Sequence, residues 1–244
     1  MKYCNKINYI FKPLGDSALI VQLDDAISEA THTKVINLVK LLETKPFPGL
    51  IEVIPGYNNV TIHYDPINVY GLMQTSNLAT AFEIVSDYIK FSLTNVTKDC
   101  SKDKNIIEIP VLYGDEYGPD LEYVAKYNKT TPETVIEFHS KKDYLVYMIG
   151  FTPGFPYLGG VDKRISTPRK AQPRLQIKAG SVGIAGEQTG IYSIDSPGGW
   201  QIIGKSPVKL FAAEKEHPTL LQSGDIIRFT PISKAEYLSI KEQS

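Results

Sequence analysis

The residues best suited to chemistry gather between positions 144 and 207. Glycines, prolines, aromatic rings and hydroxyl side chains occur there at a density that neither a helix interior nor a plain strand tolerates. Residues 150–160 show neither helical nor strand periodicity, so we interpret them as a shaped loop. Residues 179–190 and 196–200 repeat this composition. Each glycine taken singly is explained as well by a tight turn of a β-barrel, but the polar side chains among them favour a site.

Two side chains are candidates for proton transfer. Glu187 is the best-placed carboxylate among the glycines, and His139 lies at the end of a predicted helix, just before the strand that leads into the loop. A solvated histidine at a helix end explains His139 equally well. The remaining histidines occupy surface or strand positions and are not candidates: His32, His63 and His217.

A second group of residues has the chemistry to bind a substrate. Arg169 and Arg174 can each clamp a carboxylate or a phosphate through two parallel hydrogen bonds. The glycine-rich turns offer backbone N–H groups for developing negative charge. We predict that the accompanying side-chain donors also contact the substrate: Gln188, Thr189, Ser196 and Trp200. Three aromatic residues of the loop are predicted to face a ligand or a partner protein: Phe151, Phe155 and Tyr157.

A literal phosphate-loop pattern occurs over residues 199–206, but its context is wrong. The motif needs a strand before it and a helix that begins at its Lys-Ser pair. Here residues 200–203 and 207–211 are themselves strand-like, so we reject a P-loop. We keep the separate hypothesis that Lys205 binds a cofactor phosphate from the edge of the domain. The sequence shows no nucleophile elbow and no metal-ligand spacing, so no metal is predicted.

Length and composition limit the function classes. The chain has 244 residues, with 26 Lys and Arg against 27 Asp and Glu, a net charge of −1. This balance offers no field for nucleic acid or an anionic membrane. Cys4 and Cys100 lie far apart without a His/Cys cluster, which indicates neither a zinc site nor a disulfide framework. Because we find no secretory pattern and no run of roughly 18 apolar residues, we expect a cytoplasmic protein without a membrane span.

The first half predicts an α+β sandwich. Two β segments precede an amphipathic helix over residues 28–44, and two more β segments precede a second helix over about residues 69–93. The order β-β-α-β-β-α places two helices on one face of an antiparallel-rich sheet, as in the ferredoxin-like group. We assign residues 1–94 to this domain and the polar stretch 95–105 to a linker.

The second half, residues 106–244, predicts a closed β-barrel. A strand over residues 106–113 is followed by a helix that begins near Pro119. A second helix is predicted over residues 132–140, because a hydroxyl cap, a proline and an acidic residue stand at its start. The later segments are short and strand-like with turn residues between them, which is typical of a compact barrel. We expect strands at residues 144–149, 175–178, 181–185, 190–194, 200–204, 208–211 and 225–230.

Several of these segments together resemble one bacterial family. The likeness is strongest over residues 113–121, 150–160, 179–190 and 196–204, and it extends over nearly the whole chain. Members of this family are known as the B subunit of ATP-dependent 5-oxoprolinase, as allophanate hydrolase subunit 1 or as inhibitor of sporulation kinase A. Lys178 departs from the family pattern, in which a proline is common before Ala-Gly-Ser, and it adds a charge there.

The resemblance implies a ferredoxin-like domain followed by a cyclophilin-like β-barrel, in agreement with the elements above. It also implies ATP-driven ring opening of 5-oxo-L-proline to L-glutamate, in a complex with A and C subunits, of which the C subunit has a homologous barrel. The chain alone is then expected to be inactive. An alternative function within the family is inhibition of a sensor histidine kinase by protein–protein binding. A peptidyl-prolyl isomerase is suggested by the barrel alone.

Overall fold

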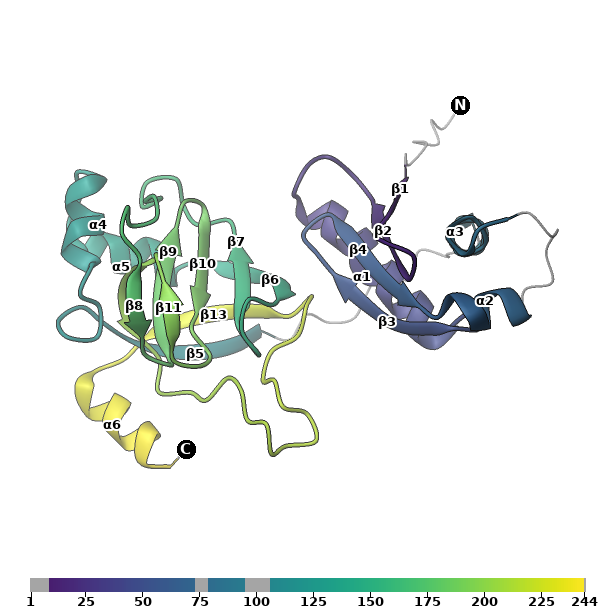
Figure 1. The fold of residues 1–244 in the computed structure, drawn as a ribbon. Helices are drawn as coiled ribbons and strands as arrows, with labels where there is room; N and C mark the ends of the chain where they lie inside the picture. Colours follow the sequence, from purple (N-terminus) through teal and green to yellow (C-terminus); the bar gives the residue numbers. More distant parts are fainter. Residues whose placement is uncertain (1–8, 73–78, 95–105, 244) are drawn as a thin grey trace. The chain divides into compact units, whose positions relative to one another are not determined.

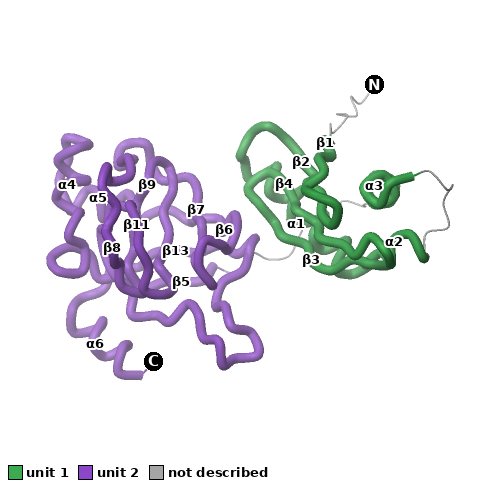
Figure 2. The backbone as a smooth tube through the Cα atoms, viewed as in Figure 1, with its two compact units in different colours: residues 1–102 green, residues 103–244 purple. Residues whose placement is uncertain are grey.

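The chain divides into two compact units, residues 1–102 and 103–244, which Figure 2 draws in different colours. A computed structural model describes residues 9–72, 79–94 and 106–243. The predicted linker, residues 95–105, lies outside the described residues.

The first unit is a sheet of four antiparallel strands in the order β1-β2-β4-β3, with helices packed on it (Figure 1). Alternate residues of β4 (Val60, Ile62 and Tyr64) are buried in a core that they share with the apolar side of α1. The predicted α+β class of this half is confirmed. Its elements are β1 (Ile10–Pro13), β2 (Ala18–Gln22), α1 (Glu29–Thr44), β3 (Leu50–Pro55), β4 (Asn59–Tyr64), α2 (Pro66–Leu72) and α3 (Ala81–Thr94).

One helix was predicted over about residues 69–93, and this prediction is wrong, because α2 and α3 are separate helices. Hydrogen bonds between nearby residues cap the start of α3. The Thr80 hydroxyl accepts from the Glu83 backbone N–H at 3.2 Å, and the Glu83 carboxylate accepts from the Thr80 backbone N–H at 2.7 Å. This reciprocal pair is a helix-start signal that the periodicity of the apolar residues conceals.

The second unit is built around a closed barrel of seven strands, in the order β10-β7-β6-β13-β5-β12-β9 (Figure 1). β5 and β13 pair in parallel, and the other neighbours are antiparallel. The predicted closed barrel is confirmed. Its strands are β5 (Ile106–Tyr113), β6 (Asp143–Ile149), β7 (Pro156–Gly159), β9 (Ser181–Ala185), β10 (Gln188–Ile191), β12 (Gln201–Lys205) and β13 (Ile226–Pro231).

The remaining elements of this unit surround the barrel. α5 has the predicted bounds, because the Thr131 hydroxyl accepts from the Thr134 backbone N–H and so begins the helix. α4 begins at Leu121 and not at Pro119. A small separate sheet is formed by β8 and β11. These elements are α4 (Leu121–Tyr127), α5 (Pro132–Ser140), β8 (Arg174–Ile177), β11 (Ser196–Gly198) and α6 (Lys234–Glu242).

Two local predictions in this unit are wrong, and one helix was missed. The shaped loop over residues 150–160 contains a barrel strand, β7, in which Gly159 lies under the ring of Tyr147 and has no room for a side chain. Residues 208–211 contribute only a single bridge, from Phe211 to Thr219, and not a strand. The C-terminal helix α6 was not predicted, although Ser233 and Glu236 form a complete capping box at its start.

Candidate functional site

Four aromatic rings, Phe155, Tyr157, Tyr192 and Trp200, form a cluster on the outer side of β9 and β10, which we call the aromatic face. The Phe155 ring lies edge-on to the other three, with centroids 4.9 Å from Tyr157, 5.2 Å from Tyr192 and 5.4 Å from Trp200. Edge-to-face pairs at these separations are favourable beyond the area they bury. Trp200 is only 4% exposed, so the cluster is a second small core outside the barrel.

Two glycines of the predicted site make room for these rings. A Cβ on Gly190 would lie 2.9 Å from the Phe155 ring and 3.1 Å from the Trp200 ring. A Cβ on Gly198 would collide with the Tyr192 hydroxyl. The prediction that such glycines let a backbone approach another group closely is correct, but at these positions the group is the chain's own aromatic side chain and not a ligand.

Arg169 is the exposed cation of the aromatic face. Its guanidinium carbon lies 5.9 Å from the centroid of the Trp200 ring, within the range of a cation–π contact. Burial raises the pKa of the Tyr192 hydroxyl to about 12, against the opposing effects of the Trp200 backbone N–H and the Arg169 charge. No described carboxylate forms an ion pair with Arg169. Its donors are therefore available for an anion.

Arg174, the second predicted clamp, is already occupied. Both of its terminal nitrogens donate to Asp120, each at 2.8 Å, in a bidentate pair. Asp120 also accepts from Lys170 at 3.1 Å and from the Ile202 backbone N–H at 2.7 Å. The structure thus assigns Arg174 to a buried ion-pair network that ties α4, β8 and β12 together, and not to an open clamp.

Asp120 is the residue that the sequence analysis missed. Burial by itself would raise the pKa of its carboxyl, but the hydrogen bonds from Arg174, the Ile202 N–H and Lys170 outweigh burial and hold the pKa below its ordinary value. The usable signal was position, because Asp120 directly precedes α4, where an acidic cap is common. In this protein the side chain makes no cap hydrogen bond and turns to the arginine instead.

His139 and Thr189 lie inside the barrel and are fully buried. The Thr189 hydroxyl donates to the Gly183 carbonyl at 2.9 Å, so it accepts from His139 Nε2 at 2.8 Å. His139 Nδ1 is then left to accept from the Tyr113 hydroxyl at 2.8 Å. The ring also stacks on Phe229, with centroids 4.4 Å apart.

This network accounts for every polar atom of the imidazole in its neutral form. Burial lowers the pKa of His139 to about 3, because an imidazolium in this interior would lose its hydration without gaining an anion. We therefore place His139 and Thr189 among the core residues. Their predicted contacts with a proton or a substrate are not supported, because neither side chain reaches the surface of the unit.

The other predicted contacts fall into different environments. Glu187 is exposed and lies in the turn between β9 and β10, with the Lys163 ammonium 3.9 Å away. Gln188 follows it and is half-buried. Ser196 is buried, and its hydroxyl has no hydrogen-bond partner among the described residues. Glu187 thus remains available for proton transfer, whereas Ser196 is closed to a ligand.

Phe151 and Phe155 also differ in their exposure to solvent. Phe155 is 1% exposed and belongs to the aromatic face, so its predicted contact with a partner is not supported. Phe151 is 61% exposed, and its ring lies nearly perpendicular to the Phe155 ring, with centroids 5.6 Å apart. Its φ of 68° is a strained value for a residue with a side chain. The half-buried Tyr157 lies between these two extremes.

The phosphate-loop pattern is confirmed to be strand and not loop, since β12 occupies Gln201–Lys205. Lys205 is half-buried at the end of this strand. Among the described residues, no group of three or more His, Cys, Asp or Glu side chains has the arrangement of a metal site. Within the same residues, no helix is both long and apolar enough to cross a membrane.

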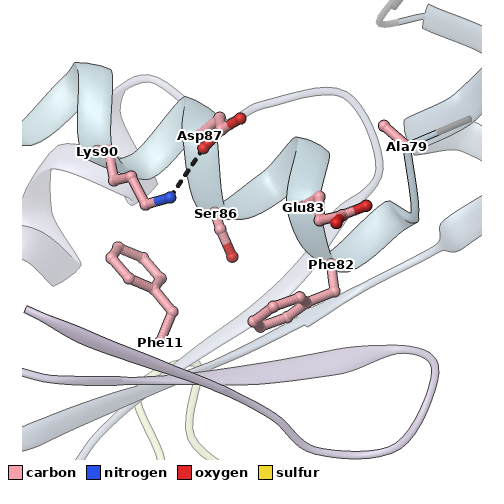
Figure 3. A pocket seen from close by; sticks show the side chains of 7 residues that line it. All are labelled: Phe11, Ala79, Phe82, Glu83, Ser86, Asp87 and Lys90. Carbon is pink, nitrogen blue, oxygen red and sulfur yellow. Dashed lines mark hydrogen bonds and ion pairs between the residues drawn. The ribbon is translucent and has the colours of Figure 1, made fainter. Parts of the chain in front are cut away.

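The first unit has a hollow of its own. Figure 3 shows it between β1 and α3, with Phe11 and Phe82 on either side and the Ser86 side chain pointing between them. The Ser86 hydroxyl is buried and has no hydrogen-bond partner among the described residues. None of the predicted site residues lines this hollow.

Comparison with known proteins gives the class of this fold. Residues 9–221 match the family model of the carboxyltransferase domain, subdomain C and D. The chain superposes on the structure of TTHA0988 with a TM-score of 0.76 and 32% identity, over 88% of this chain and 40% of that chain. The structure of PH0987 from Pyrococcus horikoshii, a conserved uncharacterized protein, is 42% identical over 93% of this chain and 100% of that one, with a TM-score of 0.53. The chain is thus a protein of the carboxyltransferase subdomain C and D class.

Curated relatives narrow the class. The chain is 46% identical to the B subunit of 5-oxoprolinase from Bacillus subtilis (strain 168), over 98% of this chain and 99% of that protein. It is 41% identical to the B subunit of 5-oxoprolinase from Haemophilus influenzae, over 89% of this chain and 95% of that protein. The chain belongs to the family of 5-oxoprolinase B subunits, which confirms the resemblance seen in the sequence.

Proposed function

We propose that this chain is the B subunit of an ATP-dependent 5-oxoprolinase that opens 5-oxo-L-proline to L-glutamate together with its A and C subunits. The identity of 46% over nearly the full length of a protein with this name carries the proposal. We further propose that the complex uses ATP, needs no metal on this chain and acts in the cytoplasm.

The substrate presents two groups to be recognised, a carboxylate and a lactam. In the reaction the lactam C–N bond breaks, the carbonyl carbon gains an oxygen from water and the nitrogen gains a proton, while ATP hydrolysis supplies the driving force. Arg169 fits the carboxylate, because it is exposed and no described carboxylate neutralises it. The neighbouring half-buried Tyr157 ring offers an apolar border for the substrate ring.

The machinery for the chemical step is incomplete on this chain. Glu187 is the only predicted proton-transfer group that reaches solvent, since His139 is enclosed in the barrel. Of the predicted side-chain donors, Thr189, Ser196 and Trp200 are buried. We therefore assign most of the donors that stabilise the developing oxyanion to a partner subunit. The exposed Phe151 ring is the anchor that we assign to this partner contact.

Reconstitution tests the proposal. 5-oxoproline-dependent release of phosphate from ATP is measured for the chain alone, for its partner subunits without it, and for all subunits together. We expect turnover only in the complete mixture. Turnover by the partners without this chain would contradict the assignment, and turnover by the chain alone would contradict its dependence on partners.

The alternative, inhibition of a sensor histidine kinase, stays a prediction. No contact among the described residues favours it. Its direct test is autophosphorylation of the purified kinase with and without the chain.

A further inference from the structure

The segment around Arg169, residues 167–170, is fastened to its neighbours on both sides of the arginine. We call this segment the strap. At its start, the Thr167 carbonyl accepts from the Gly186 N–H at 2.7 Å, in an isolated β-bridge between these two residues. The Thr167 side chain is buried, and its hydroxyl accepts from Asn128 Nδ2 at 2.9 Å. This end of the strap is thus held by two separate parts of the unit.

The other end of the strap is held by Lys170. Its backbone N–H donates to the Gly199 carbonyl at 2.7 Å, and its ammonium donates to the Asp120 carboxylate at 3.1 Å. Between the two ends, the Arg169 side chain is exposed and its guanidinium lies over the Trp200 ring. The strap thus presents Arg169 to solvent on a backbone that is fixed before and after it.

Gln201 adds a third attachment, beside Arg169 itself. Its side-chain Nε2 donates to the Pro168 carbonyl at 2.9 Å. That carbonyl belongs to the peptide group that carries the Arg169 N–H, so the hydrogen bond fixes the orientation of this peptide plane. Gln201 is only 2% exposed, and it directly follows Trp200 in the chain. One side chain thus connects the backbone of Arg169 with the strand that carries the ring beneath its guanidinium.

The other polar atom of the Gln201 side chain has no comparable contact. Its Oε1 is buried and has no hydrogen-bond partner among the described residues. A buried acceptor without a partner is destabilising, and an apolar side chain of the same size would avoid this cost. Stability alone therefore does not explain a glutamine at this position, whereas the hold of its amide N–H on Pro168 does.

We propose that Gln201 is a positioning residue for the substrate carboxylate and acts through Arg169. By fixing the strap, it keeps the guanidinium beside the Trp200 ring before the substrate arrives. A clamp that is already in place loses less conformational freedom on binding, which lowers KM. The inference rests on the proposed function for the identity of the ligand, 5-oxo-L-proline, but the coupling between Gln201 and Arg169 does not depend on it.

Substitution by methionine removes the amide of Gln201 and keeps the length of the side chain. The unpaired Oε1 is removed as well, and the carbonyl of the exposed Pro168 can bond to water, so Gln201→Met should keep its melting temperature within about 4 °C. In the reconstituted enzyme, we expect KM for 5-oxoproline to rise about three- to fivefold, with kcat and KM for ATP unchanged. Gln176→Met is the matched control and should leave KM unchanged, because Gln176 is an exposed glutamine whose Nε2 donates to Asp195.

A double variant separates positioning from a general structural effect. If Gln201 acts through Arg169, Gln201→Met should raise KM no further in an Arg169→Ala enzyme. A general weakening of the unit would raise KM by the same factor in both backgrounds. That result would overturn the inference, and so would an unchanged KM for Gln201→Met beside a raised KM for Arg169→Ala.

The coupling is also measured without substrate, because Trp200 is the one tryptophan of the chain. Its fluorescence emission in the isolated chain should change in Arg169→Ala. Gln201→Met should change the emission of the unmodified chain and not that of Arg169→Ala. If the complex does not turn over 5-oxoproline, or if Arg169→Ala leaves KM unchanged, the proposed function fails and the fluorescence alone decides the positioning. The same emission change from Gln201→Met in both backgrounds, or no change in Arg169→Ala, would then refute it.

Discussion

The polar groups on the two sides of β10 differ in whether they already have a bonding partner. Thr189 points into the barrel, where it closes a hydrogen-bonded chain with His139 and Tyr113. Gly190, the next residue, points outward and is bare so that Phe155 and Trp200 can lie against the strand. Beyond those rings, Arg169 reaches solvent with no described carboxylate partner.

The comparison shows that a structural group and a functional group differ in whether they are free to bind a proton or a ligand, and not in residue type. The interior network has each donor matched to an acceptor, so an added proton or ligand would break it. The outer face ends in a charge without a counter-ion among the described residues, so an anion would complete it. The predictions below test this contrast by breaking contacts on each side.

The largest loss of stability is expected at Asp120. Asp120→Ala leaves Arg174, Lys170 and the Ile202 N–H without their shared acceptor, and should lower the free energy of unfolding by about 3 to 5 kcal/mol. Asp195→Ala is the matched control. Asp195 also accepts from a lysine and a backbone N–H, but it is exposed, so its removal should cost less than about 1 kcal/mol. Urea unfolding measures both; equal losses would mean that the Asp120 network stabilises no more than a surface ion pair.

The glycines of the aromatic face come next. Gly190→Ala places a Cβ 2.8 Å from the Pro156 carbonyl oxygen and 2.9 Å from the Phe155 ring, which should lower the free energy of unfolding by about 2 to 3 kcal/mol. Gly199→Ala, a short distance along the chain, meets nothing closer than 3.7 Å and should cost less than about 1 kcal/mol. Thermal melting of the two variants compares them. A Gly190→Ala protein as stable as Gly199→Ala would show that the rings are not held against the strand.

The interior network makes stability depend on pH. The pKa of His139 is about 3 in the folded chain and about 6.5 when unfolded, so below pH 6.5 the unfolded state binds a proton that the folded state refuses. The stabilisation from the neutral ring is complete above pH 6.5 and is lost as the pH falls towards 3. At pH 5 the loss is about 2 kcal/mol.

A glutamine at this position tests the assignment. His139→Gln removes the titrating group, so the difference in unfolding free energy between pH 7 and pH 5 should shrink by about 2 kcal/mol. His217→Gln changes an exposed histidine and should keep the difference of the unmodified chain. An unchanged pH difference in His139→Gln would mean that His139 is not held neutral.

Much of the fold follows from the sequence, because local signals agree with it. The bounds of α5 follow from Thr131 and Pro132, and those of β5 and β9 follow from short apolar runs. The helix α6 escaped prediction although its capping box is a local signal, whereas the strand β7 depends on contacts that are distant in sequence. β7 was not predicted, because its residue Gly159 packs under the Tyr147 ring and its pairing with β6 and β10 cannot be recognised in a short stretch of sequence.

The site was predicted less well than the fold. The sequence singled out Arg169, Trp200 and Tyr157 as site residues, and the structure places them on one face. The sequence did not show which of the predicted side chains are already bonded to other parts of the chain. Arg174 forms a salt bridge with Asp120, which is 54 residues away in the chain. Burial of His139 likewise depends on β10 and β13, which follow it by many residues. Such pairings are set by the tertiary fold, which no local pattern encodes.

The most direct test compares one residue from each side of the barrel wall in the reconstituted enzyme. Arg169→Ala and Thr189→Val are each assembled with the partner subunits, and KM for 5-oxoproline is measured at saturating ATP. We expect Arg169→Ala to keep its melting temperature and to raise KM by about tenfold or more, because it loses the ligand of the substrate carboxylate. We expect Thr189→Val to lower the melting temperature and to leave KM within about twofold. An unchanged KM in Arg169→Ala, or a tenfold rise in a folded Thr189→Val enzyme, would contradict the assignment of substrate binding to the outer face.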